Sequence, residues 1–251
     1  MSIYGAANKL NLNWKKDLKV TIRSFFPKKQ KFEPEGWGKE MKLNGNLYKY
    51  SDWIMKFGYL NLLWVLFTLT GLIIFGFVPA TISLFTITRA WIRGNTDIPI
   101  WSTFLKVYKS EFVKSNKVGL VYLLGGFVLF IDERFLVQSP GSLNIVMVIL
   151  LLIIAVLFFI SFMYFFPAYV HFKLNPLAYI RYSIMMGLSQ FPYTIIMVAG
   201  VWFSYILLRY LPGVFLFFGG SILSYIVMWS ANKAFEKVQV KAMNLQKLNT
   251  L

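Results

Sequence analysis

The 251-residue sequence lacks cysteine, contains a single histidine and is poor in charge, with 14% of its residues being Asp, Glu, Lys or Arg. An ordinary soluble domain carries about 25%. The absence of cysteine excludes disulfides, thiolate metal ligands and cysteine nucleophiles. With His171 alone, one chain cannot build a two-histidine metal site, and a Ser-His-Asp triad would have to use that residue. His171 closes an apolar segment, where we interpret it as a solvated cap.

Charge is absent from long stretches of the chain. Residues 57–88 contain no charged side chain, and four more such runs follow at 118–131, 135–172, 182–208 and 210–232. A hydrocarbon core about 30 Å thick requires about 20 apolar residues in a helix. We therefore predict an all-α integral membrane protein, and the hydrophobic content of 57% agrees with this class.

The basic residues predict the topology, because Lys and Arg accumulate in cytoplasmic segments. If residues 57–91 form a helical hairpin broken between Gly76 and Pro79, 24 of the 26 Lys and Arg lie inside, leaving Arg134 and Arg209 outside. We predict a six-span helical bundle with both termini cytoplasmic. The predicted spans are residues 53–76, 78–93, 116–132, 143–168, 183–208 and 212–232. The charge count does not separate a full crossing at 78–93 from a re-entrant segment.

The chain is predicted to have three parts: a basic cytoplasmic extension at 1–43, the transmembrane bundle at 44–236 and a basic cytoplasmic tail at 237–251. Residues 9–26 of the extension have the pattern of an amphipathic helix, which we expect on the anionic inner leaflet, with docking on a partner protein as the alternative. The net charge of +16 favours binding to anionic lipid. Nucleic-acid binding is not predicted, because no basic block is joined to a nucleic-acid-binding module. The expected membrane-surface residues are Trp14, Lys15, Lys16, Leu18, Lys19, Ile22, Arg23 and Phe25.

A second interfacial helix is predicted in the cytoplasmic loop at residues 89–117. Gly94 and Asp97 belong to a turn signal, and Pro99 suits the first turn of a new helix. Aromatic and aliphatic residues then recur on one helical face, which packs on the bundle or forms a contact surface for another protein. The partner-binding candidates are Trp91, Arg93, Asp97, Pro99, Trp101, Phe104, Tyr108 and Phe112.

A family resemblance lies in the segment that runs from Asn46 to Asn116. Its motifs are Asn61-Leu62-Leu63-Trp64, Gly76-Phe77-Val78-Pro79-Ala80, and Trp91-Ile92-Arg93-Gly94 followed by Asp97-Ile98-Pro99. With these motifs the chain resembles the YesL family of bacterial membrane proteins over residues 44–117, and afterwards only in hydropathy. The family has no established biochemical activity. The resemblance implies a protein of the bacterial cell membrane in a carbohydrate-uptake context, and it implies no catalytic residue.

The sequence contains no P-loop, no Gly-x-Gly-x-x-Gly and no Gly-x-Ser-x-Gly. We predict a non-catalytic protein without cofactor or metal, acting as an accessory subunit of an oligosaccharide ABC-type transporter and binding its permease. A first alternative is an independent channel or carrier, and the residues that would line its path are Asn61, Thr68, Ser83, Ser161, Gln190 and Ser204. A second alternative is an intramembrane lipid- or sugar-modifying enzyme that uses Asp132, Glu133 or His171. Asp132 and Glu133 lie beside Arg134, however, and we interpret this charged cluster as the end of a span at the membrane interface.

Overall fold

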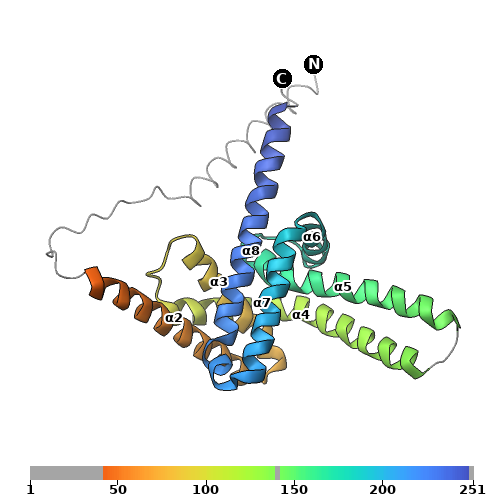
Figure 1. Ribbon diagram of the computed structural model, residues 1–251, viewed down its shortest axis with the longest axis horizontal. Helices are drawn as coiled ribbons and strands as arrows, with labels where there is room; N and C mark the ends of the chain where they lie inside the picture. Colours follow the sequence, from red (N-terminus) through yellow and green to blue (C-terminus); the bar gives the residue numbers. More distant parts are fainter. Residues whose placement is uncertain (1–41, 139–141, 249–251) are drawn as a thin grey trace, which may run out of the picture. The chain divides into compact units, whose positions relative to one another are not determined.

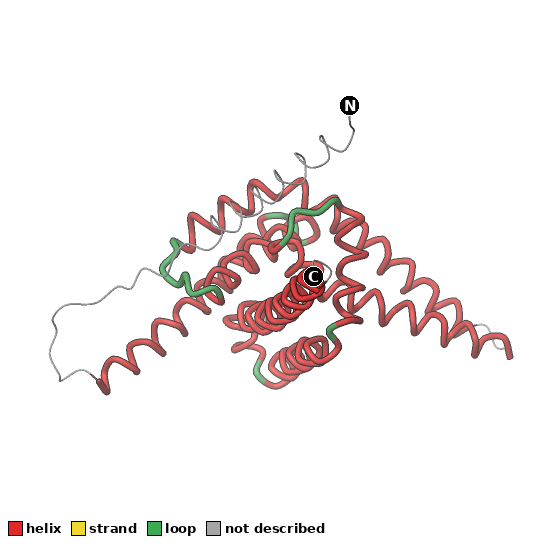
Figure 2. The backbone as a smooth tube through the Cα atoms, turned by 90° about the horizontal axis from the view of Figure 1, so that it is seen from above, coloured by secondary structure: helices red, strands yellow, loops and turns green. Residues whose placement is uncertain are grey.

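The computed structural model describes residues 42–138 and 142–248, which fold into helices without a strand (Figures 1 and 2). Residues 47–251 form one compact unit. The predicted helix at 9–26 and its membrane-surface residues lie outside the described residues. The helices are α2 (Lys42–Thr70), α3 (Ile74–Ile92), α4 (Ile100–Gln138), α5 (Ser142–His171), α6 (Pro176–Ser189), α7 (Phe191–Tyr210) and α8 (Pro212–Leu248).

Five helices in the described part of the chain are long and apolar enough to cross a membrane. Their apolar segments are Lys49–Thr70, Ile74–Ile92, Ile145–His171, Phe191–Tyr210 and Pro212–Lys241. The predicted all-helical membrane class is thereby confirmed in this coarser form, whereas six crossings, the sidedness of the termini and the interfacial helices stay predictions.

Helix α3 is the centre of the bundle. It packs on α4, α5 and α8, and 61% of an apolar 18-residue stretch of α3 is buried, against 11% for such a stretch of α5. On one side it contributes Leu84 and Trp91 to a core shared with α2 and α4. On the other side Ile82 and Phe85 join a larger aromatic core with α4, α5, α6 and α8. Both cores are built mainly from large apolar side chains, in keeping with the composition.

The predicted helix break between Gly76 and Pro79 is wrong, because the chain turns earlier, at residues 71–73. Leu72 and Ile73 adopt positive φ angles of 58° and 63°, and the Ile73 amide donates to the carbonyl oxygen of Thr68 at 2.9 Å. A Cβ atom at Gly76 would collide with that same carbonyl oxygen, so the tight approach of the two helix ends requires glycine there. Pro79 lies inside α3.

Two further boundaries differ from the sequence prediction. The interfacial helix and the third span, expected as separate elements, form the single 39-residue helix α4, because residues 113–117 contain neither glycine nor proline. The expected fifth span at 183–208 is divided at Gln190 into α6 and α7, with Pro192 in the first turn of α7. An amide hydrogen in the first turn of a helix has no acceptor within that helix. Proline, which lacks this hydrogen, is therefore tolerated there. Helix α8 continues through most of the predicted tail.

Candidate functional site

The aromatic face of α4 is turned toward the bundle. Phe104 is fully buried and Tyr108 is 9% exposed. Both rings pack on Phe67 of α2, with centroid distances of 5.2 and 4.9 Å, and the Tyr108 hydroxyl donates to the Phe67 carbonyl oxygen at 3.1 Å. Burial raises the pKa of Tyr108 above its ordinary value. Of the two alternatives for this helical face, packing on the bundle therefore holds for Phe104 and Tyr108, and a contact surface for another protein is wrong for them, because both hold α4 against the α2–α3 hairpin.

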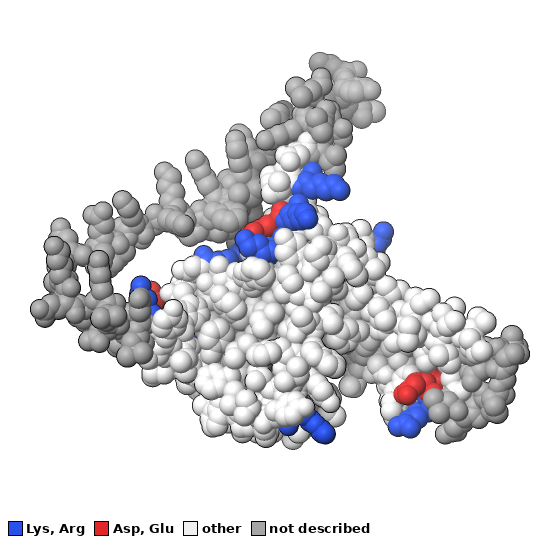
Figure 3. Space-filling view, viewed as in Figure 1, with Lys and Arg blue, Asp and Glu red and all other residues white. Residues whose placement is uncertain are grey.

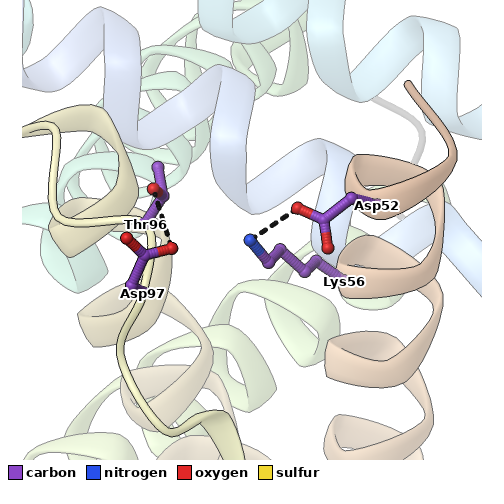
Figure 4. Close-up of polar contacts among 4 residues, drawn as sticks. All are labelled: Asp52, Lys56, Thr96 and Asp97. Carbon is purple, nitrogen blue, oxygen red and sulfur yellow. Dashed lines mark hydrogen bonds and ion pairs between the residues drawn. The ribbon is translucent and has the colours of Figure 1, made fainter. Parts of the chain in front are cut away.

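The other partner-binding candidates are spread around the α3–α4 loop. Trp91 is buried and Phe112 half-buried, while the exposed candidates are Arg93, Asp97, Pro99 and Trp101. Contact between the rings of Trp53 and Trp91 places the start of α2 beside the end of α3. Figure 4 shows the Thr96–Asp97 hydrogen bond of this loop and the Asp52–Lys56 ion pair of α2. The exposed part of the predicted site thus combines the charged residues Arg93 and Asp97 with Pro99 and Trp101.

A large apolar cleft, which the sequence did not reveal, lies between the α2–α3 turn, α4 and α5. Its volume is about 710 Å³, within the range of sites that hold small ligands. Asn116 and Tyr122 are the polar members of its lining, and phenylalanines such as Phe127 and Phe158 dominate the rest. No periodic signal could have found this cleft, because it arises from the angle between helices.

The outer halves of α4 and α5 form a helical hairpin with little cover. They run together, away from the remaining helices (Figures 1 and 2), and large apolar residues from Leu120 on α4 and from Ile145 on α5 are exposed. Charge returns only toward the end of α4, at Asp132, Glu133 and Arg134. On the face shown in Figure 3, charged side chains gather at the margins and leave a charge-free surface between them.

Four of the six polar residues proposed to line a carrier make side-chain hydrogen bonds within the bundle, whereas the Thr68 hydroxyl is buried without a partner in the described part of the chain. Asn61 joins α2 to α8, because its Nδ2 donates to the Leu216 carbonyl oxygen at 2.6 Å and its Oδ1 accepts from the Ser221 amide at 3.0 Å. Ser161 bonds the Tyr122 hydroxyl at 2.8 Å. Ser83 and Ser204 donate to carbonyl oxygens one turn back in their own helices. None of the six carrier candidates lines the apolar cleft described above.

The groups proposed for an intramembrane enzyme are not brought together. Asp132 and Glu133 are exposed near the end of α4, whereas His171 ends α5. The intervening α5 has 30 residues and is about 45 Å long. Within the described ranges, no cluster of three or more His, Asp or Glu side chains could hold a metal ion.

One polar network in the aromatic core was missed by sequence reasoning. The Tyr169 hydroxyl of α5 donates to Glu111 of α4 at 2.8 Å, and the Tyr169 ring stacks on Tyr179 of α6 at 5.0 Å. The Tyr179 hydroxyl donates to the Phe172 carbonyl oxygen and accepts from the Leu174 amide. Burial raises the pKa of Tyr179 above its ordinary value. The network ties α4, α5 and α6 together and fixes the α5–α6 loop.

Long apolar helices around a central α3 define a multi-pass helical membrane protein. Within that class the chain belongs to the YesL-like family, whose model, described as "Protein of unknown function, DUF624", matches residues 57–133. The chain is similar to three uncharacterized proteins of Bacillus subtilis (strain 168). It is 39% identical to YteU over 184 residues, covering 73% of this chain and 82% of YteU. It is 34% identical to YesL over 192 residues, covering 76% of this chain and 90% of YesL.

The third relative, YesV, is 33% identical over 195 residues, covering 78% of this chain and 94% of YesV. No solved structure matches the chain. The predicted family resemblance is confirmed, but its restriction to residues 44–117 was too narrow. Alignments of this length also include the helices that follow α4, where apolar residues are interchangeable and leave few recognisable motifs.

Proposed function

We propose that the protein is a non-catalytic membrane component that binds another membrane protein through the α4–α5 hairpin and the apolar cleft at its base. The observation that carries the proposal is the poor cover of the hairpin, where 11% of an apolar 18-residue stretch of α5 is buried. Helices associate in membranes by close packing rather than by escape from water. A cleft of about 710 Å³ edged by large aromatic side chains offers a surface for such packing.

The partner we propose is the permease of an oligosaccharide ABC-type transporter, so that this chain is an accessory subunit in the bacterial cell membrane. The carbohydrate context rests on the family resemblance. The membrane-embedded mode of binding rests on the hairpin and cleft. The exposed α3–α4 loop residues Arg93 and Asp97 supply the accompanying contact on the cytoplasmic side.

We place both termini in the cytoplasm. We also infer that the α2–α3 turn lies within the hydrocarbon layer. Six crossings would put this turn in water on the outer side, while four crossings and a re-entrant α2–α3 hairpin give the same distribution of Lys and Arg. The turn favours the second arrangement. Leu72, Ile73 and Ile74 are 78%, 59% and 61% exposed, and their backbone amides are all hydrogen bonded, as hydrocarbon requires.

Co-purification in mild detergent at native expression levels tests the proposed function. Leu123→Ala with Phe127→Ala alters two cleft-lining residues of α4 that are 54% and 60% exposed. Leu188→Ala with Phe191→Ala is the matched control, because these residues are 57% and 63% exposed and lie on α6 and α7, outside both the hairpin and the cleft. A permease recovered with the wild type and the control, but lost with the cleft variant, supports the proposal. Recovery of this chain alone in several detergents contradicts it.

The independent channel or carrier is the competing function. It is less well supported because none of its six polar candidates lines the cleft and four of them are bonded within the bundle. Liposomes containing only this protein separate the two functions: a carrier moves solute under these conditions, and an accessory subunit does not.

A further inference from the structure

Three basic groups meet where the ends of α3 and α5 approach α8. Arg89 and Arg93 are one helical turn apart at the end of α3, and both lie within electrostatic range of His171, the last residue of α5. The His171 ring packs on Phe235 of α8 with a centroid distance of 4.8 Å. Arg89 is half-buried and Arg93 is exposed, so the group extends from the protein interior to its surface.

The partly buried Arg89 guanidinium has no anionic partner in the described part of the chain. The Nε atom of Arg89 and the Nδ1 atom of His171 are both buried and have no hydrogen-bond partner in the described part of the chain. The carboxylate that acts on Arg93 electrostatically is Glu236 of α8. Glu236, however, accepts a hydrogen bond from Asn232 at 2.8 Å and pairs with Lys233 at 3.6 Å. The Glu236 carboxylate therefore has two other partners, and the positive charge of Arg89 and Arg93 remains in excess.

The end of a helix attracts cations, which accounts in part for arginines at this position. That attraction leaves two facts unexplained. A buried guanidinium nitrogen with no acceptor is costly, and two arginines four residues apart on a helix repel each other. Both costs vanish when one anion is bound between them.

We propose that Arg89, Arg93 and His171 form a binding site for a phosphate group, either the headgroup of an anionic phospholipid or a free phosphorylated solute. Guanidinium groups bind phosphate oxygens in pairs with good geometry. Basic pockets between helices at the cytoplasmic interface hold phospholipid headgroups. In the proposed topology the site lies at that interface, because α3 ends in the cytoplasmic α3–α4 loop.

Two measurements on the delipidated full-length protein separate the sources of phosphate. Native mass spectrometry compares the retention of phosphatidylglycerol with that of phosphatidylcholine. Thermal unfolding compares sodium phosphate with sodium chloride at equal ionic strength. The test variant is Arg89→Gln with Arg93→Gln. The control is Lys106→Gln with Lys109→Gln, which removes the same charge from exposed positions of α4.

For a lipid site, we expect phosphatidylglycerol retention to fall about tenfold in the arginine variant and to stay unchanged in the lysine control. For a free-solute site, phosphate raises the Tm of the wild type and the control but not of the arginine variant, and lipid retention is equal throughout. Equal effects in both variants, or no preference of the wild type for either probe, overturn the proposal. If the double variant loses its helical circular dichroism, Arg93→Gln alone, at an exposed position, serves for the same comparison.

Discussion

Asn116 of α4 donates a hydrogen bond from Nδ2 to the carbonyl oxygen of Phe75 at the start of α3, 2.9 Å away. Phe75 is the residue whose carbonyl would accept from the amide of residue 79, and Pro79 has no amide hydrogen. Because neighbouring helices can satisfy such freed groups in membranes, proline is tolerated inside α3. A side chain 41 positions away in the sequence thus repairs a defect that the sequence of α3 creates.

Replacing Asn116 by Leu is expected to lower the free energy of unfolding by about 1–3 kcal/mol, because the Phe75 carbonyl is left unsatisfied. In a Pro79→Ala background the same replacement should cost clearly less, since the alanine amide supplies the missing helical bond. A double-mutant cycle from unfolding monitored by circular dichroism in detergent measures the difference. Equal costs in both backgrounds would show that Asn116 acts independently of the proline.

The absence of cysteine makes each introduced thiol the only one in the chain, which allows a direct test of the α2–α3 turn. Leu72→Cys is expected to resist a membrane-impermeant maleimide added from outside, because the apolar turn lies in hydrocarbon. Arg134→Cys should react from outside, and Asn95→Cys only after the membrane is opened. Rapid labelling of Leu72→Cys from outside would instead establish six full crossings, and outside labelling of Asn95→Cys would refute the charge-based topology.

Gly187 of α6 packs directly on α5, where a Cβ atom would collide with the Cγ2 methyl group of Ile160. We expect Gly187→Ala to destabilise the protein by about 1–3 kcal/mol, as overpacked cores do. Adding Ile160→Ala should recover part of that loss. Gly213→Ala is the matched control, since a Cβ there has open space within 4 Å. Similar unfolding temperatures for all three variants and the wild type would contradict the close packing of α5 and α6.

Tyr169→Phe removes only the hydroxyl that donates to Glu111 at 2.8 Å. We expect a loss of about 1–3 kcal/mol in unfolding free energy, because the partner is a partly buried carboxylate. Glu111→Gln keeps an acceptor for the hydroxyl and should cost less than Tyr169→Phe. The order of the two unfolding free energies tests the network, and a larger loss for Glu111→Gln would assign the carboxylate a different role.

The sequence predicted the helical membrane class because long charge-free runs have few other structural solutions. It misplaced the hairpin break because Pro79 is a strong local breaker, and its compensation by Asn116 is a tertiary contact. Gly71 and Gly76, which make the actual turn possible, look like ordinary small residues in an apolar run. Local signals therefore located helices well and their ends poorly.

The candidate site was less predictable for a related reason. The spacing of Phe104 and Tyr108 correctly indicated one apolar face of a helix, but spacing does not say what covers that face, and Phe67 covers it. The apolar cleft and the Arg89–Arg93–His171 group combine residues from helices far apart in sequence. Such sites depend on helix packing, which periodicity does not describe.

Helix α8 runs without interruption from Pro212 to Leu248, about 55 Å, although its apolar segment ends at Lys241. Its basic residues Lys233, Lys237 and Lys241 recur every four positions and so share one stripe. Because the helix is continuous, turning its buried half about the axis turns this stripe through the same angle. The Asn61–Ser221 bond near the start of α8 and the lysine stripe farther along therefore belong to one helix, and a rotation of α8 at that contact would turn the positive charge in the same direction.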